Sequence, residues 1–248
     1  MTIDIIDEAE SEGLITEIHE RKNQLLRPKI TNVDQSILVF TLVDPVANFD
    51  FLDKLSILTS HQEVELVIVV NKMDKVEEGN KDLEYIKRIY GGIGYKIIFT
   101  STKQMLGIEE VKEVISSRVS VLSGLSGVGK SSLINLICPE ANMETGEISN
   151  KNKKGKHTTR YTNFIKIEDG YVADSPGFSS LEFNFPQEEL ELYFKEFVPH
   201  LGQCRFSNCS HISEPDCGIK PQVGISISQE RYERYVTFFK EFNNTYKR

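Results

Sequence analysis

The sequence predicts an α/β fold in which helices cover both faces of a mostly parallel sheet. Four continuous apolar runs indicate buried strands, and segments with helical spacing of their apolar residues lie between them. The expected strands span 37–43, 64–70, 95–101 and 118–124, and the expected helices span 49–60, 81–90 and 107–117. Strands that alternate with helices are typical of a parallel sheet, because each helix carries the chain back to the same end of the sheet.

The rest of the chain predicts smaller elements. Residues 14–19 alternate as in one short strand, and 163–167 and 171–175 form an expected hairpin, since the turn residues EDG separate them. An amphipathic helix is expected over 188–201. A last helix over 228–242 places four apolar or aromatic residues on one face, which we expect to pack in a core: Tyr232, Tyr235, Val236 and Phe239.

Composition and charge narrow the class of protein. No apolar run among the 248 residues approaches the ~18–20 residues of a membrane span, and the acidic first residues do not resemble a secretory signal. We therefore expect a cytoplasmic protein without a membrane partner. The formal net charge of −8 argues against general affinity for nucleic acid. Residues 148–167 are basic and contain no acid, so a nucleic-acid contact and a merely solvated loop both remain open there.

The stretch GLSGVGKSS contains the full pattern of a phosphate-binding loop, between an expected strand and an expected helix. Its glycines allow backbone N–H groups to turn around phosphate oxygens, and the start of the helix adds its positive dipole end. We expect Lys130 to reach the β- and γ-phosphates and the Ser131 hydroxyl to bind Mg²⁺. The predicted ligands of the nucleotide in this loop are Gly124, Leu125, Ser126, Gly127, Val128, Gly129, Lys130, Ser131 and Ser132.

The motif NKMD directly follows the second expected strand. Ligands of open α/β sheets bind at the carboxyl ends of the strands, so this motif is placed to recognise a nucleotide base. Asp74 can accept hydrogen bonds from N1–H and the 2-amino group of guanine, which adenine does not offer, and this predicts GTP. Asn71 would bond the base or brace the phosphate loop, and the stem of Lys72 would cover the ring. The predicted base site is Asn71, Lys72, Met73, Asp74, Ser101 and Thr102.

The motif DSPG at 174–177 fits a segment that senses the γ-phosphate. Asp174 would hold Mg²⁺ through a water, and the N–H of Gly177 would contact the phosphate. Thr158 and Thr159 are both candidates for the threonine that closes over Mg²⁺, and we favour Thr159. The predicted magnesium site is Ser131, Thr159 and Asp174.

Many GTPases orient the attacking water with a glutamine after this motif, but here the position is Phe178. His157 is the candidate for that role, because a neutral imidazole can accept a proton or orient a water. A surface histidine in a basic loop is the alternative. The sequence predicts weak intrinsic hydrolysis that a partner accelerates, with Lys130, His157 and Thr159 as catalytic residues.

Three cysteines and one histidine cluster late in the chain: Cys204, Cys209, His211 and Cys217. In a cytosolic chain such a cluster indicates metal binding and not disulfides. Three thiolates and an imidazole make the tetrahedral donor set of a structural Zn²⁺ site, with no position for water. Free reduced cysteines are the alternative.

The motifs follow one another as NKMD, TST, GLSGVGKSS, TT and DSPG, a rotation of the usual GTPase order. This order looks like that of a circularly permuted P-loop GTPase. Together with it, NVDQ at 32–35, GKHTTR at 155–160, DSPGFSSLEF at 174–183 and the CRFSNC-x-H cluster at 204–211 resemble the RsgA family of ribosome small-subunit-dependent GTPases.

The resemblance implies three domains: an N-terminal OB fold, of which residues 1–29 hold only a remnant, a permuted GTPase domain over 30–185, and a zinc-binding domain over 186–248. It implies hydrolysis of GTP to GDP and phosphate in late maturation of the small (30S) ribosomal subunit, with release from the subunit coupled to hydrolysis. The implied cofactors are Mg²⁺ and one structural Zn²⁺. The implied partners are the small subunit and its 16S rRNA, bound by a monomer.

Other functions stay open at this point. A nucleotide-dependent rRNA-binding module with little hydrolysis of its own is compatible with Phe178 and the short N-terminal segment. A permuted GTPase of large-subunit assembly would share the motif order, but the Cys/His cluster argues against it. Asp74 disfavours a P-loop kinase or ATPase.

Overall fold

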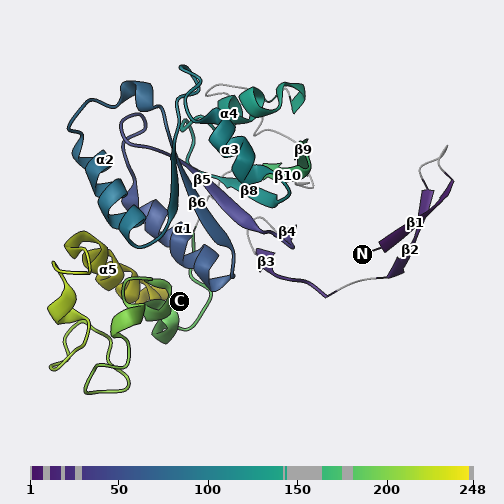
Figure 1. The fold of residues 1–248 in the computed structure, drawn as a ribbon. Coiled ribbons are helices and arrows are strands. Elements are labelled where there is room, and N and C mark those ends of the chain that lie inside the picture. The colour runs from purple at the N-terminus through teal and green to yellow at the C-terminus, as the bar shows by residue number, and fades with distance from the viewer. Residues whose placement is uncertain are drawn as a thin grey trace.

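A computed structural model of the chain describes residues 2–7, 12–17, 20–25, 30–141, 143, 164–174 and 181–245. Its centre is a sheet of six strands in the order β7-β6-β5-β8-β10-β9 (Figure 1). The strands are β5 (Gln35–Thr41), β6 (Glu65–Asn71), β7 (Lys96–Phe99), β8 (Val119–Ser123), β9 (Phe164–Ile167) and β10 (Gly170–Asp174). All neighbours pair in parallel except β9 and β10, which form the expected hairpin.

Helices cover both faces of this sheet, as predicted (Figure 1). They are α1 (Phe49–His61), α2 (Lys81–Tyr85), which continues as the π-helix η2 (Ile86–Gly91), α3 (Ile108–Ile115) and α4 (Lys130–Ile137). Two short 3-10 helices, η1 (Met73–Lys75) and η3 (Pro139–Ala141), lie in the connections.

Successive side chains of the central strands point to opposite faces, and both faces are buried. In β5, Ile37 and Val39 pack with α3 and α4, whereas Leu38 and Phe40 pack with α1 and η2. The continuous apolar runs of the sequence therefore reflect strands with a helix layer on each side.

Shorter strands precede the sheet. β1 (Thr2–Asp7) and β2 (Glu12–Glu17) form an antiparallel hairpin that lies apart from the rest of the described chain (Figure 1). The pair β3 (Gln24–Leu25) and β4 (Ile30–Thr31) follows, and Leu25 and Ile30 are buried. That residues 1–29 are a remnant of an OB fold stays a prediction, as do the domain boundaries at 29/30 and 185/186.

The prediction of an amphipathic α-helix over 188–201 is wrong. The structure has two 3-10 helices instead, η5 (Gln187–Tyr193) and η6 (Val198–His200). Phe194, Glu196 and Phe197 are all buried, although an α-helix would turn residues i and i+2 away from each other. The chain therefore leaves the helical conformation at Phe194, whose φ of −91° and ψ of 95° are extended.

The last helix, α5 (Gln229–Thr245), packs against α1, and the short 3-10 helix η7 (Lys220–Gln222) precedes it. The predicted apolar face is confirmed, because Tyr235 is 1% exposed and the other three residues pack against the same cluster. Ile57 and Leu58 of α1 belong to this cluster, so α1 serves both the sheet and the C-terminal segment. Among the described residues, no helix has the length and apolar character needed to cross a membrane.

Candidate nucleotide site and metal centre

The phosphate loop joins β8 to α4 at the carboxyl edge of the sheet, where the parallel strands end. Gly124 has a φ of +141°, and a Cβ there would lie 2.4 Å from the carbonyl oxygen of Val39. The Lys130 ammonium donates to the carbonyl oxygens of Gly124 (2.7 Å) and Leu125 (2.8 Å), which holds its charge inside the curve of the loop. The loop can therefore present N–H groups and one cation to a phosphate chain.

Asn71 connects the predicted base motif to the phosphate loop. Its side-chain amide donates to the carbonyl oxygen of Val128 (3.0 Å) and accepts from the Thr100 hydroxyl (3.1 Å). Asn71 is fully buried, and a Cβ on Gly129 would lie 2.4 Å from its Nδ2. The structure thus brings NKMD against the loop that follows it by about fifty residues. Of the two roles predicted for Asn71, it has the contacts of a brace for the phosphate loop.

Asp74 is oriented by the segment that follows β7. The hydroxyl of buried Ser101 donates to Asp74 Oδ1 at 2.6 Å, and the Gln104 N–H donates to the same hydroxyl at 3.2 Å. The Ser101 hydrogen bond is the main cause that lowers the pKa of Asp74, and the positive charges of Lys103 and Lys75 add to it. The carboxylate is therefore held ionised and in one orientation, as an acceptor of two donors on a base must be.

Replacing Ser101 with alanine is expected to narrow the pH range in which the protein binds GTP. A carboxylate whose pKa is lowered supports binding at neutral pH and loses it as the pH falls through that pKa. Without the Ser101 hydroxyl, the pKa of Asp74 rises toward its ordinary value, so affinity falls at a higher pH than in the unchanged protein. Titrations of GTP affinity from about pH 7 to pH 4 measure the shift.

Ser116→Ala is the matched control for this prediction, because the Ser116 hydroxyl bonds Asp169 and no base-motif residue. It should leave unchanged the pH at which GTP affinity falls. If affinity fell at the same pH in Ser101→Ala and in the wild-type protein, the assigned role of Ser101 would be contradicted.

Two charged residues near the base motif, Asp44 and Lys103, were not predicted from the sequence. Asp44 follows β5 at the carboxyl edge, and Lys75 Nζ lies 2.5 Å and Lys72 Nζ 3.7 Å from its Oδ2. Lys103 follows Ser101 and influences Asp74 by its charge. Asp44 could have been predicted from the sequence, because it lies just beyond the carboxyl end of a buried strand, as the NKMD motif does.

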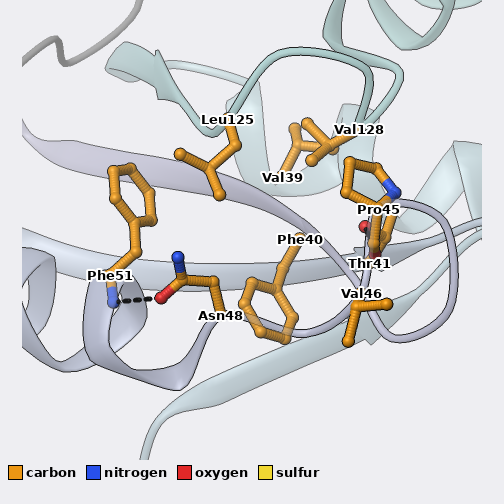
Figure 2. Close-up of a pocket in the computed structure, with 9 residues that line it drawn as sticks. All are labelled: Val39, Phe40, Thr41, Pro45, Val46, Asn48, Phe51, Leu125 and Val128. Atoms are coloured by element: carbon orange, nitrogen blue, oxygen red, sulfur yellow. Dashed lines mark hydrogen bonds between the residues drawn. The ribbon is translucent and has the colours of Figure 1, made fainter.

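The loop after β5 also packs against the phosphate loop, and a small pocket lies between them (Figure 2). Its lining residues are Val39, Phe40, Thr41, Pro45, Val46, Asn48, Phe51, Leu125 and Val128. The Asn48 side chain accepts from the Phe51 N–H and begins α1 at this point. The start of α1 is therefore a neighbour of the phosphate loop.

The predicted magnesium ligands are only partly described. Ser131 is the second residue of α4, and β10 ends at Asp174 in register with Leu122, two residues before Gly124. The backbone thus brings Asp174 to the phosphate loop. His157, Thr158, Thr159 and Gly177 lie outside the described residues, and their roles stay predictions.

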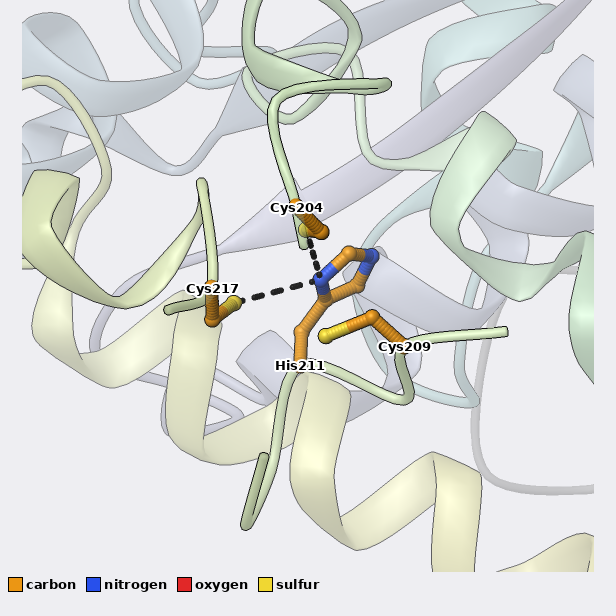
Figure 3. A group of neighbouring side chains, drawn as sticks. All are labelled: Cys204, Cys209, His211 and Cys217. Carbon is orange, nitrogen blue, oxygen red and sulfur yellow. Dashed lines mark hydrogen bonds between the residues drawn. The ribbon is translucent and has the colours of Figure 1, made fainter. Parts of the chain in front are cut away.

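The four predicted zinc ligands come together in space (Figure 3). Their ligand atoms all lie within 4.8 Å of one another, and Cys209, His211 and Cys217 are buried. A tetrahedron with Zn–S bonds of ~2.3 Å has edges of ~3.8 Å, so the spacing suits one ion. Burial raises the pKa of the Cys209 thiol to about 12, so zinc must displace a proton there and its affinity rises with pH.

Comparisons with known proteins agree with this site. The chain matches a family model described as RsgA GTPase over residues 18–184. A small ribosomal subunit biogenesis GTPase RsgA from Caldanaerobacter subterraneus subsp. tengcongensis is 43% identical over 96% of this chain and 81% of its own length. The protein of the same name from Thermotoga maritima is 44% identical over 92% of this chain and 78% of its own length.

Two solved structures share the fold. The crystal structure of YjeQ from Thermotoga maritima has a TM-score of 0.80 and 41% identity, over 94% of this chain and 80% of that one. The structure of YloQ, described as a circularly permuted GTPase, has a TM-score of 0.80 and 34% identity, over 98% of this chain and 79% of that one. A solved structure with this fold is therefore described as a permuted GTPase, in agreement with the rotated motif order of this chain.

Proposed function

This chain belongs to the RsgA GTPase family, and we propose that it hydrolyses GTP to GDP and phosphate during late maturation of the small ribosomal subunit. The observation that carries the proposal is the bridge from Asn71 to Val128, together with the bond from Ser101 to Asp74. These bonds unite the motifs of a GTP site although their order in the chain is rotated. GTP hydrolysis is the activity that this combination of motifs supports best.

We propose that water attacks the γ-phosphate in line, and that catalysis consists of positioning and charge stabilisation. Lys130 and the N–H groups of the phosphate loop would stabilise the charge that builds on the oxygen between the β- and γ-phosphates. Mg²⁺, when bound, neutralises phosphate charge, and Ser131, Thr159 and Asp174 are its proposed ligands. Orientation of the water by His157 stays a prediction.

Zn²⁺ would be held by Cys204, Cys209, His211 and Cys217. With four protein donors it leaves no open position, so we assign it a structural role and no part in hydrolysis. The hydrogen bond from the Tyr232 hydroxyl of α5 to the His211 carbonyl oxygen supports a role in the shape of the C-terminal segment.

We infer that the partner is the small ribosomal subunit, bound through its 16S rRNA by a monomer in the cytoplasm. The names of the relatives support the subunit as partner. The run of lysines within residues 148–167 supports a contact with RNA phosphate, in a chain that is otherwise acidic. Release of the subunit after hydrolysis would complete the cycle.

GTP turnover measured with and without purified small subunits tests this function. We expect slow hydrolysis by the chain alone and faster hydrolysis with subunits, and Lys130→Ala should lose both. Sedimentation with subunits should be stronger with a non-hydrolysable GTP analogue than with GDP. Binding to subunits without turnover in either condition would favour the rRNA-binding module, and equal competition by ATP would contradict the base site.

A further inference from the structure

We propose that Glu191 positions His211 for zinc, by accepting a hydrogen bond from Nε2 so that Nδ1 faces the three cysteines. Glu191 lies on η5, outside the cluster of four ligands, and nothing in the spacing of the cysteines selects it. The inference concerns the metal centre alone and is independent of nucleotide hydrolysis.

The two nitrogens of the His211 ring face opposite surroundings. Nδ1 lies 3.5 Å from Cys204 Sγ and 3.4 Å from Cys217 Sγ (Figure 3). Nε2 lies 2.5 Å from Glu191 Oε2. The side chain of His211 is 3% exposed and that of Glu191 is 28% exposed, so water has little access to the ring. The geometry leaves Nδ1 as the nitrogen that can reach a metal among the thiolates.

An imidazole that binds a metal through Nδ1 must carry its proton on Nε2. A carboxylate at Nε2 accepts that proton in a hydrogen bond, fixes the tautomer and makes the opposite nitrogen a stronger donor to the metal. Glu191 therefore keeps the proton of the His211 ring on Nε2 and leaves the lone pair of Nδ1 for the metal.

The main chain at His211 is held by a different element. His211 has a φ of +61°, in a region that residues other than glycine rarely occupy. The Tyr232 hydroxyl donates to the His211 carbonyl oxygen at 2.7 Å, and the Tyr235 hydroxyl donates to that of Ser210 at 3.0 Å. α5 thus fixes the backbone of the ligand. The rings of Phe197 and Tyr235 pack beside its imidazole at 6.2 Å, and Glu191 supplies the hydrogen bond at Nε2.

The neighbouring acid Glu189 of η5 has another partner. Glu189 accepts from the Tyr193 hydroxyl at 2.8 Å, and that hydroxyl also contacts His61 of α1. Fully buried Leu190 anchors η5 in the C-terminal core. η5 is thus held by contacts that Glu191 does not make, and a change at Glu191 can test the ring without removing the anchor.

Zinc affinity and release rate in the full-length, zinc-loaded protein test the proposal. Competition with a chelator at fixed pH should show a loss of about 10- to 100-fold in affinity for Glu191→Ala. Glu191→Gln should lose less, because its amide oxygen can still accept from Nε2–H. Glu188→Gln removes an exposed acid of the same helix and should match the unchanged protein.

A second measurement separates positioning from general stability. Ring ¹⁵N spectra of the zinc-loaded protein should show Nδ1 bound to metal and a proton on Nε2 that exchanges slowly, and Glu191→Gln should speed this exchange. Ligation through Nε2 in the unchanged protein would overturn the proposal. So would unchanged zinc affinity and release in folded Glu191→Ala. If Glu191→Ala does not fold, the same criteria apply to Glu191→Gln.

Discussion

Replacing Asp53 with alanine is expected to lower the free energy of unfolding by about 3–5 kcal/mol. Asp53 lies on α1 with no exposed surface, and its carboxylate pairs with Arg231 and Arg234 of α5. The Tyr90 hydroxyl also donates to Asp53 Oδ1, at 2.7 Å. Loss of this carboxylate leaves buried Arg231 and partly buried Arg234 with too little negative charge, which costs far more than the pair contributes when intact.

The surroundings of Arg231 show why the effect should be large. Arg231 is fully buried and forms a second ion pair with Glu196. Burial acts to lower the pKa of Arg231, but the charges of Asp53 and Glu196 outweigh it and raise the pKa well above its ordinary value. A guanidinium does not lose its proton in proteins, so Arg231 stays charged when Asp53 is removed and cannot escape the penalty by becoming neutral.

Chemical denaturation at fixed zinc concentration measures this loss. Asp50→Ala is the control, because Asp50 is an exposed acid of the same helix and its removal should cost less than about 1 kcal/mol. A loss below about 1 kcal/mol for Asp53→Ala would show that the network is not required for stability.

Replacing Asp74 with asparagine is expected to exchange guanine for xanthine as the preferred base. The carboxylate accepts two donors of guanine, and each such charge-assisted bond contributes about 1.5–3 kcal/mol, so GTP affinity should fall by about 10²- to 10⁴-fold. Xanthine has a carbonyl oxygen in place of the 2-amino group. The Ser101 hydroxyl bonds Oδ1 and can keep the amide oriented so that its NH₂ donates to this oxygen.

Dissociation constants for GTP and xanthosine triphosphate measure the exchange. Glu77→Gln makes the same kind of change at an exposed residue shortly after the motif and should alter neither constant. If Asp74→Asn weakened both nucleotides equally, Asp74 would act on the fold of the site and not on the choice of base.

The elements and motifs that depend on local sequence could be predicted. Apolar runs mark β5 and β6 because both faces of these strands are buried, and the phosphate loop needs its glycines in a fixed local pattern. The rotated motif order could be predicted because NKMD, TST, the phosphate loop and DSPG each begin at the end of a strand. The four zinc ligands could be predicted because three cysteines and one histidine so close in the chain are a donor set typical of a metal site.

Features that depend on contacts between distant segments could not be predicted in the same way. Glu191 and Asp53 look like ordinary acids of helical segments, and only the folded chain gives them His211 and Arg231 as partners. The prediction of a helix over 188–201 was wrong because it, too, depended on contacts between distant segments. Its apolar spacing is helical, but in the folded chain the backbone becomes extended at Phe194 and Glu196 pairs with buried Arg231.

The pairing of Asp53 with Arg231 has a consequence for biosynthesis, because the two residues are 178 positions apart in the chain. At a synthesis rate of about 5–20 residues per second, roughly 10–35 s pass between them. During that time the Asp53 carboxylate of α1 lacks the two arginines of α5 that pair with it in the folded chain. The helix that begins beside the phosphate loop can therefore reach its final packing only when α5 has been made. A truncated product that lacks α5 would leave Asp53 with the Tyr90 hydroxyl and without its two arginines.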